Sequence, residues 1–234
     1  MGWRVRFKRS TFGIVEKKTT SQMKKSKKLK RVQTAVEYIL SNPAAQKAMN
    51  KVGVSKADVL QGKALVEQVR LLDAAQRKEY GEQYQATDDL TQARQEARAL
   101  YIRHVETARF ALKEQRGHWN TLELSGARKD DLFGWLDQAR NFYRNVATVK
   151  DILAKYDLSE AELLQGESMI EAVNVAHNVR QNEATEAQAA TTERNEAVAK
   201  LDAWMRHFTQ SARLAFANDP QTLKGLGLVS KVGI

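Results

Sequence analysis

Apolar and polar residues alternate along most of this chain with the three- and four-residue spacing of amphipathic helices. The spacing predicts two long helical segments, 56–116 and 160–217, and each of them follows two short helical patterns. The short patterns cover residues 32–40 and 49–52 before the first long segment, and residues 132–143 and 152–153 before the second. Only two prolines, Pro43 and Pro220, interrupt the chain. The sequence therefore predicts an all-α protein.

Both long segments begin with the same start signal. Ser55 precedes Asp58 by three residues, and Ser159 precedes Glu162 by the same spacing. This is the capping-box pattern, in which the hydroxyl and the carboxylate each accept a hydrogen bond from a backbone amide of the first helical turn. The two helix starts are thus predicted close to residues 56 and 160.

The shared start belongs to an internal duplication. Residues 31–126 match residues 135–230 without a gap at an offset of 104 positions, which predicts a tandem repeat of about 96 residues. We expect the two repeats to form one body of long antiparallel helices, either coiled-coil-like or a four-helix bundle, with short helices at its ends. Matching residues include Leu60, Gln61 and Gly62 with Leu164, Gln165 and Gly166, and Glu79 and Glu82 with Glu183 and Glu186.

Each long segment is either one continuous helix or a hairpin that folds back near Thr87 or Thr191. Nothing larger than alanine among apolar residues lies between Val179 and Val198, as in an exposed hairpin tip. However, no glycine or proline is present there to break the helix, so we favour continuous helices. Gly62 and Gly166, inside these helices, predict close packing of a crossing short helix rather than a ligand contact.

The charge of the chain is concentrated at its N-terminus. The whole sequence has 38 basic and 28 acidic residues, but the first 33 residues hold twelve Lys or Arg and one Glu. The remaining 201 residues carry 26 basic and 27 acidic side chains, so the body is nearly neutral. We expect residues 1–30 to be a basic, disordered tail.

The basic tail is the candidate binding site for nucleic acid or an anionic surface, because clustered cations release counterions from phosphates. The alternative is that the tail is simply solvated, or that the natural chain starts at Met23. The candidate polyanion-binding residues are Lys24, Lys25, Lys27, Lys28, Lys30 and Arg31.

No catalytic, cofactor-binding or metal-binding residue is predicted. The chain has no cysteine, and no histidine has a glutamate three residues before it, as di-iron carboxylate sites require. His104 lies on an apolar helix face and is interpreted as a core histidine. Four aromatic residues with helical spacing are interpreted as core rather than as a base-stacking surface: Phe133, Trp135, Phe142 and Tyr143.

Two further features bear on location. The longest apolar stretch of the tail, residues 12–15, is too short for a signal peptide, and no run of about 18 apolar residues predicts a transmembrane helix. We therefore expect a cytoplasmic protein.

The stretch Lys78–Tyr84 (KEYGEQY), with Ala86, Thr87 and the later residues 108–112, resembles a family of uncharacterised bacterial proteins built from the same doubled unit of long helices. The resemblance covers residues 31–230. It implies a bacterial origin and a duplicated helical fold, and it carries over no functional residue.

These observations favour a non-enzymatic scaffold or protein-interaction function without a cofactor. Two long helices alone bury limited surface, so we expect self-association into a homo-oligomer or binding to another protein. The alternative is a nucleic-acid-binding or anionic-surface-binding protein that acts through its basic N-terminal tail.

Overall fold

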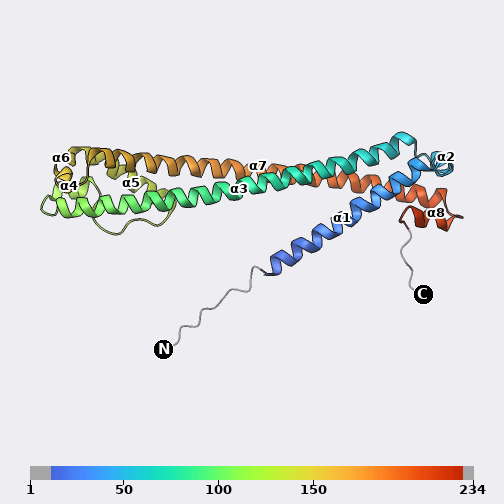
Figure 1. The fold of residues 1–234 in the computed structure, drawn as a ribbon, viewed down its shortest axis with the longest axis horizontal. Helices are drawn as coiled ribbons and strands as arrows, with labels where there is room; N and C mark the ends of the chain where they lie inside the picture. The colour runs from blue at the N-terminus through green and yellow to red at the C-terminus, as the bar shows by residue number, and fades with distance from the viewer. Residues whose placement is uncertain (1–11, 229–234) are drawn as a thin grey trace, which may run out of the picture. The chain divides into compact units, whose positions relative to one another are not determined.

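The computed structural model describes residues 12–228, with side chains from residue 26 onward. In that range the chain is all-α, as predicted, and contains no strand (Figure 1). The elements are α1 (Phe12–Ser41), α2 (Pro43–Lys51), α3 (Lys56–Ala111), α4 (Arg116–Thr121), α5 (Leu132–Val146), the 3-10 helix η1 (Ala147–Val149), α6 (Lys150–Ala154), α7 (Glu160–Ala215) and α8 (Pro220–Gly225).

Both capping boxes form where the sequence predicts them. The Ser55 amide donates to the Asp58 carboxylate at 2.8 Å, and the Asp58 amide donates to the Ser55 hydroxyl at 3.2 Å. The same two bonds join Ser159 and Glu162, at 3.0 and 3.3 Å. Each box satisfies two backbone amides that the helix itself leaves without a partner.

The long segments α3 and α7 are single helices of 56 residues each, which confirms the prediction of continuity. α3 ends at Ala111, five residues before the predicted end. The Gln115 amide donates to the Leu112 carbonyl at 2.8 Å in a tighter turn, and the indole nitrogen of Trp119 donates to the same carbonyl at 2.7 Å. α8 then follows α7 with Pro220 in its first turn.

The N-terminal helix is longer than the sequence predicts. Residues 12–30, expected to belong to a disordered tail, lie in α1, and residues 1–11 fall outside the described residues. The physical reason is composition, because Lys, Gln and Met have high helix propensity and no proline occurs before Pro43. The basic residues are therefore presented on a helix.

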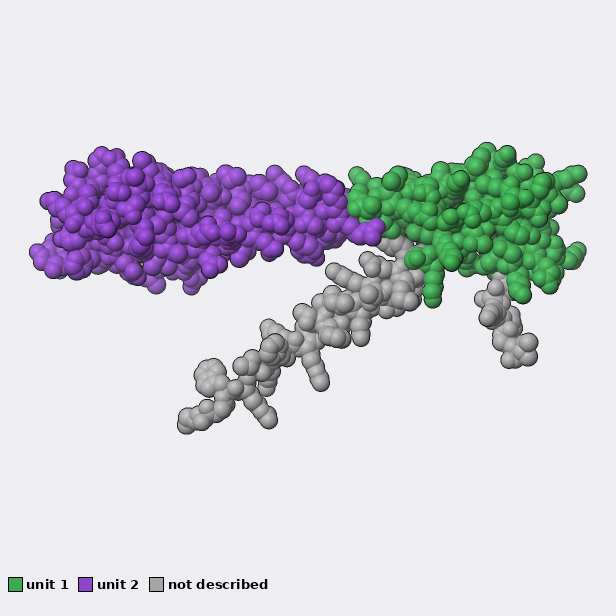
Figure 2. All heavy atoms as spheres, viewed as in Figure 1, with its two compact units in different colours: residues 1–75, 191–234 green, residues 76–190 purple. Residues whose placement is uncertain are grey.

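The chain divides into two compact units (Figure 2). Unit 1 combines residues 1–75 with 191–234, and unit 2 is residues 76–190. Each unit contains part of both α3 and α7, so the units do not coincide with the predicted repeats, 31–126 and 135–230. Each long helix thus contributes residues to both hydrophobic cores.

The core of unit 1 joins α1 and α2 to the end of α7. Ile39 and Met49 are fully buried and belong to one cluster with Phe208. The Trp204 indole stacks on Phe208 and donates to the Asp58 carbonyl at 2.8 Å. The start of α3 therefore packs against the end of α7 in this unit.

The core of unit 2 is aromatic. Tyr101 of α3 makes edge-to-face contacts with Trp135 and Phe142 of α5, and all three are fully buried. Tyr143 is also buried, which confirms the core interpretation for three of the four predicted aromatic residues. The core interpretation is wrong for Phe133, because 63% of this residue is exposed.

Two glycines allow close packing of aromatic side chains on the long helices. Gly62 lies against the Trp204 ring, and Gly166 lies against the Tyr143 phenol, so a Cβ on either glycine would overlap the ring. The predicted close packing is confirmed. At Gly166 the neighbour belongs to the short helix α5, as expected, whereas at Gly62 it belongs to α7.

Candidate polyanion-binding groove

A groove of about 640 Å³ lies in unit 1 between α1 and the last third of α7. Among the residues whose side chains the structure describes, cations dominate the lining, and one carboxylate, Asp202, contributes negative charge. The lining residues are Lys27, Lys28, Arg31 and Val32 from α1, and Asp202, Met205, Arg206, Thr209, Gln210 and Arg213 from α7.

Helical spacing explains why the cations of α1 flank this groove. Leu29 and Val32 are buried in the unit 1 core and attach α1 to its neighbours. Lys28 and Arg31 lie one residue before each of them, at the border between the buried face and solvent. Their positions hold the charged groups at the edge of the core, where long side chains can keep their charged ends in water.

α7 supplies the opposite wall by the same principle. Phe208 and Ala212 are buried, while Arg206 and Arg213 are exposed. These arginines are seven residues apart, two helical turns, so they lie on one face of α7. The groove therefore has cations on both walls.

The groove carries excess positive charge. Lys28 forms an ion pair with Asp202, and this pair neutralises one cation with the single carboxylate. Among the described residues, the other four cations of the groove make no ion pair with a carboxylate, and all four are exposed: Lys27, Arg31, Arg206 and Arg213. Four cations thus remain available to an anionic ligand, and arginine forks match phosphate oxygens well.

The structure brings together some of the predicted polyanion-binding residues. Lys27, Lys28 and Arg31 line the groove, whereas Lys30 is exposed outside it. Lys24 and Lys25 lie in α1, but their side chains fall outside the described residues.

Sequence reasoning missed Arg206 and Arg213. Their helix has mixed charge, so no local excess of basic residues marks them in the sequence. Only the packing of α1 beside α7 makes them part of the same groove.

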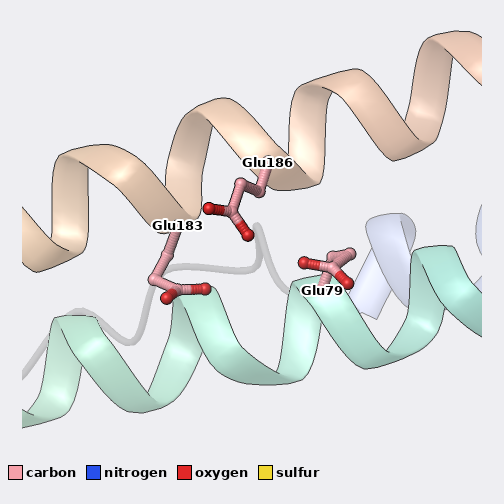
Figure 3. Close-up of side chains that lie close together, drawn as sticks. All are labelled: Glu79, Glu183 and Glu186. Carbon is pink, nitrogen blue, oxygen red and sulfur yellow. The ribbon is translucent and has the colours of Figure 1, made fainter.

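A second cluster, in unit 2, is acidic. Glu79 of α3 and Glu183 and Glu186 of α7 point towards one another, and one carboxylate oxygen from each lies within 4.8 Å of the others (Figure 3). The sequence contained a signal for it, because Glu79 and Glu183 are equivalent residues of the predicted repeats. It did not reveal that the two would face each other.

The acidic cluster raises the pKa of one member. Desolvation, together with the negative charges of Glu186, Glu82 and Glu79, raises the pKa of Glu183 above its usual value, and nearby Lys78 opposes this rise. Lys78 itself pairs with Glu82 at 2.9 Å. Oxygen donors of this type suit hard divalent cations, but exposed acidic side chains also gather without a metal, so the cluster alone identifies no metal site.

His104 is a buried titratable group in unit 2. Its Nδ1 lies 3.0 Å from the Tyr143 hydroxyl, and its Nε2 has no hydrogen-bond partner within the part of the chain that the structure describes. Burial, with a smaller contribution from Arg103, lowers the pKa of His104 to about 4, although Glu162 opposes the shift. The core interpretation of His104 is confirmed, with one ring nitrogen satisfied.

No protein-family model, curated protein or solved structure matches this chain. The resemblance to bacterial proteins of doubled long helices therefore stays a prediction. Among residues 12–228, no helix combines the length and the apolar character needed to cross a membrane.

Proposed function

We propose that this chain is a non-enzymatic helical scaffold that binds the phosphate backbone of nucleic acid through the groove between α1 and α7. The observation that carries the proposal is the set of four cations, Lys27, Arg31, Arg206 and Arg213, that line one groove without a partnering carboxylate among the described residues. Neutralising phosphates with such cations releases counterions, which provides most of the affinity of sequence-independent binding.

The shape of the site favours a phosphate chain over a planar membrane surface. Cations from two helices lie on both walls of the groove, so a linear polyanion that enters it can meet both walls. The described lining residues include no aromatic side chain, so the proposal assigns no base stacking to them. Binding is expected to depend on phosphate contacts and to show little sequence preference.

The scaffold part of the proposal includes a tandem duplication whose long helices run antiparallel. Two contacts in unit 1 support this direction: Trp204 reaches Asp58, whereas Arg194, ten residues earlier, reaches Asp73, fifteen residues later. In unit 2, the proximity of the equivalent residues Glu79 and Glu183 agrees with a duplicated unit that packs against itself.

The binding experiment compares two variants that change net charge equally. Fluorescence anisotropy with a labelled oligonucleotide should show at least a tenfold loss of affinity for Arg206→Glu/Arg213→Glu. The control, Lys113→Glu/Arg116→Glu, changes exposed cations of unit 2 and should alter affinity less than threefold. Point variants are preferable to deletion of residues 1–31, because Leu29 is part of the unit 1 core.

Salt dependence provides the second measurement. Each neutralised phosphate contributes a slope of about −0.7 to −0.9 to the dependence of log affinity on log salt, so four contacts predict a loss of roughly 50- to 150-fold between about 50 and 200 mM salt. Equal losses for the groove and control variants would contradict the proposal. Binding to anionic vesicles but not to oligonucleotides would assign the groove to a membrane surface instead.

A self-associating scaffold is the second candidate function. The observation that favours it is the exposure of large apolar side chains on the long helices, such as Leu71 at 72% and Leu164 at 60%. Sedimentation velocity of the full chain at micromolar concentration tests it, and a monomer at every concentration would contradict it.

A further inference from the structure

The outer face of α3 in unit 1 is an exposed apolar stripe. Leu60 and Leu71 are 45% and 72% exposed, and the positions between and beside them that share this face carry mostly alanine. Spacings of three, four and seven residues place all of these positions on the face opposite the unit 1 core. We call this the α3 face: Ala57, Leu60, Ala64, Leu71 and Ala75.

The same face recurs on α7 in unit 2. Leu164 is 60% exposed, Val175 59% and Val179 44%. Leu164 and Val175 occupy the positions that correspond, 104 residues later, to Leu60 and Leu71. We call this the α7 face: Ala161, Leu164, Ala172, Val175 and Val179, all of them exposed.

The two faces carry opposite charges along one flank. Lys56 and Lys63 lie beside the α3 face, and the equivalent positions beside the α7 face are Glu160 and Glu167. All four are exposed. Three of them make no ion pair with another described residue: Lys56, Lys63 and Glu167. Glu160 pairs with Lys150 at 3.0 Å, and the Glu160 side chain is 64% exposed.

We propose that the α3 face of one copy of this chain docks against the α7 face of a second copy. The occupant is a second copy because one chain carries both an apolar face with a basic flank and an apolar face with an acidic flank. Antiparallel packing of the two helices brings both flanks to the same side of the pair, so Lys56 and Lys63 meet the row of Glu160 and Glu167. Like faces would instead bring like charges together.

This inference rests on the proposed self-association and assigns it to a surface. Small residues, such as Ala64 and Ala172, allow the two helices to approach closely, while the leucines and valines supply apolar area. A contact between two different faces is heterologous. In a pair of copies, one copy therefore keeps a free α7 face and the other a free α3 face, unless further copies close the assembly into a ring.

Charge reversal tests the pairing directly. In Lys56→Glu/Lys63→Glu both flanks are acidic, and in Glu160→Lys/Glu167→Lys both are basic. Each variant alone should associate at least tenfold more weakly than the wild-type chain in sedimentation velocity at low salt. A one-to-one mixture should recover association, because the acidic α3 flank of one variant then meets the basic α7 flank of the other. Circular dichroism verifies that both variants remain helical.

An apolar variant with a matched control completes the test. Leu71→Glu should weaken association at least tenfold, whereas Leu214→Glu, which changes another exposed leucine outside both faces, should leave it unchanged. If the wild-type chain associates but the mixture gives no recovery and the two leucine variants behave alike, the docking faces are wrong and self-association stands. If the wild-type chain is monomeric throughout, both proposals are overturned.

Discussion

Gly166 of α7 packs directly against the phenol of Tyr143 in α5, and the same hydroxyl lies 3.0 Å from Nδ1 of the buried His104. The positions of two side chains, one from α5 and one from α3, thus depend on the absence of a Cβ at one position of α7. In unit 1, Gly62 has the corresponding relationship with Trp204. These contacts explain why glycine, which weakens a helix interior, is present at both positions.

The first prediction concerns these glycines. Gly166→Ala should destabilise the protein by about 1 to 3 kcal/mol, because the added Cβ overlaps a rigid ring in a packed core. Gly81→Ala, in α3, is the matched control, since a Cβ there meets nothing within 4 Å. The control should stabilise the helix by roughly 0.5 to 1 kcal/mol. Urea denaturation measures both, and equal effects would contradict the packing argument.

The second prediction concerns the capping box of α3. Ser55→Ala removes the hydroxyl that accepts the Asp58 amide hydrogen bond and should cost about 1 kcal/mol. Ser55→Asn keeps a side-chain acceptor at the cap and should retain most of the stability. The free energy of unfolding from urea titration distinguishes the two variants. A similar loss for both would mean that the cap does not depend on an accepting oxygen.

The third prediction uses the lowered pKa of His104. The folded protein holds His104 neutral down to a pKa of about 4, whereas the unfolded chain takes up this proton near pH 6.5. The unfolded state therefore binds more protons between these values, and stability should fall as the pH falls from about 6.5 to 4, by roughly 3 kcal/mol in total. Above pH 6.5 His104 makes no contribution to the pH dependence.

His104→Gln supplies the comparison for this pH dependence. Glutamine does not titrate, so the difference in unfolding free energy between wild type and variant should shrink as the pH falls from 6.5 to 4. Measurements at several pH values across this window are sufficient. A constant difference would show that His104 does not titrate as its burial implies.

The fourth prediction concerns the acidic cluster. The pKa of Glu183 is raised in the folded state, so the folded protein binds more protons than the unfolded chain just above the usual glutamate pKa. Stability from this group is therefore greatest at low pH and is lost as the pH rises through the folded pKa. Glu183→Gln should raise the melting temperature at neutral pH and have less effect near pH 4. Glu196→Gln, an exposed glutamate of α7 outside the cluster, is the control.

Part of the candidate site could be inferred from sequence. The candidate polyanion-binding residues are five lysines and one arginine near the N-terminus, and three of them, Lys27, Lys28 and Arg31, line the groove. Arg206 and Arg213 could not be found in this way, because their role depends on which helix packs beside theirs. Residues 12–30 are helical rather than disordered as expected. The expectation gave more weight to their charge density than to their helix propensity.

What the sequence determined by itself is local. The capping boxes at Ser55 and Ser159 specify where the long helices begin, and the absence of proline between Pro43 and Pro220 allows them to continue, because each signal acts within a few residues. The tertiary structure decided which distant residues meet. It joined Arg31 to Arg213 in one groove, brought Glu79 to Glu183, and left Leu71 and Val175 exposed. These outcomes depend on the register in which helices pack, which arises from the summed burial of many apolar side chains rather than from any short stretch of sequence.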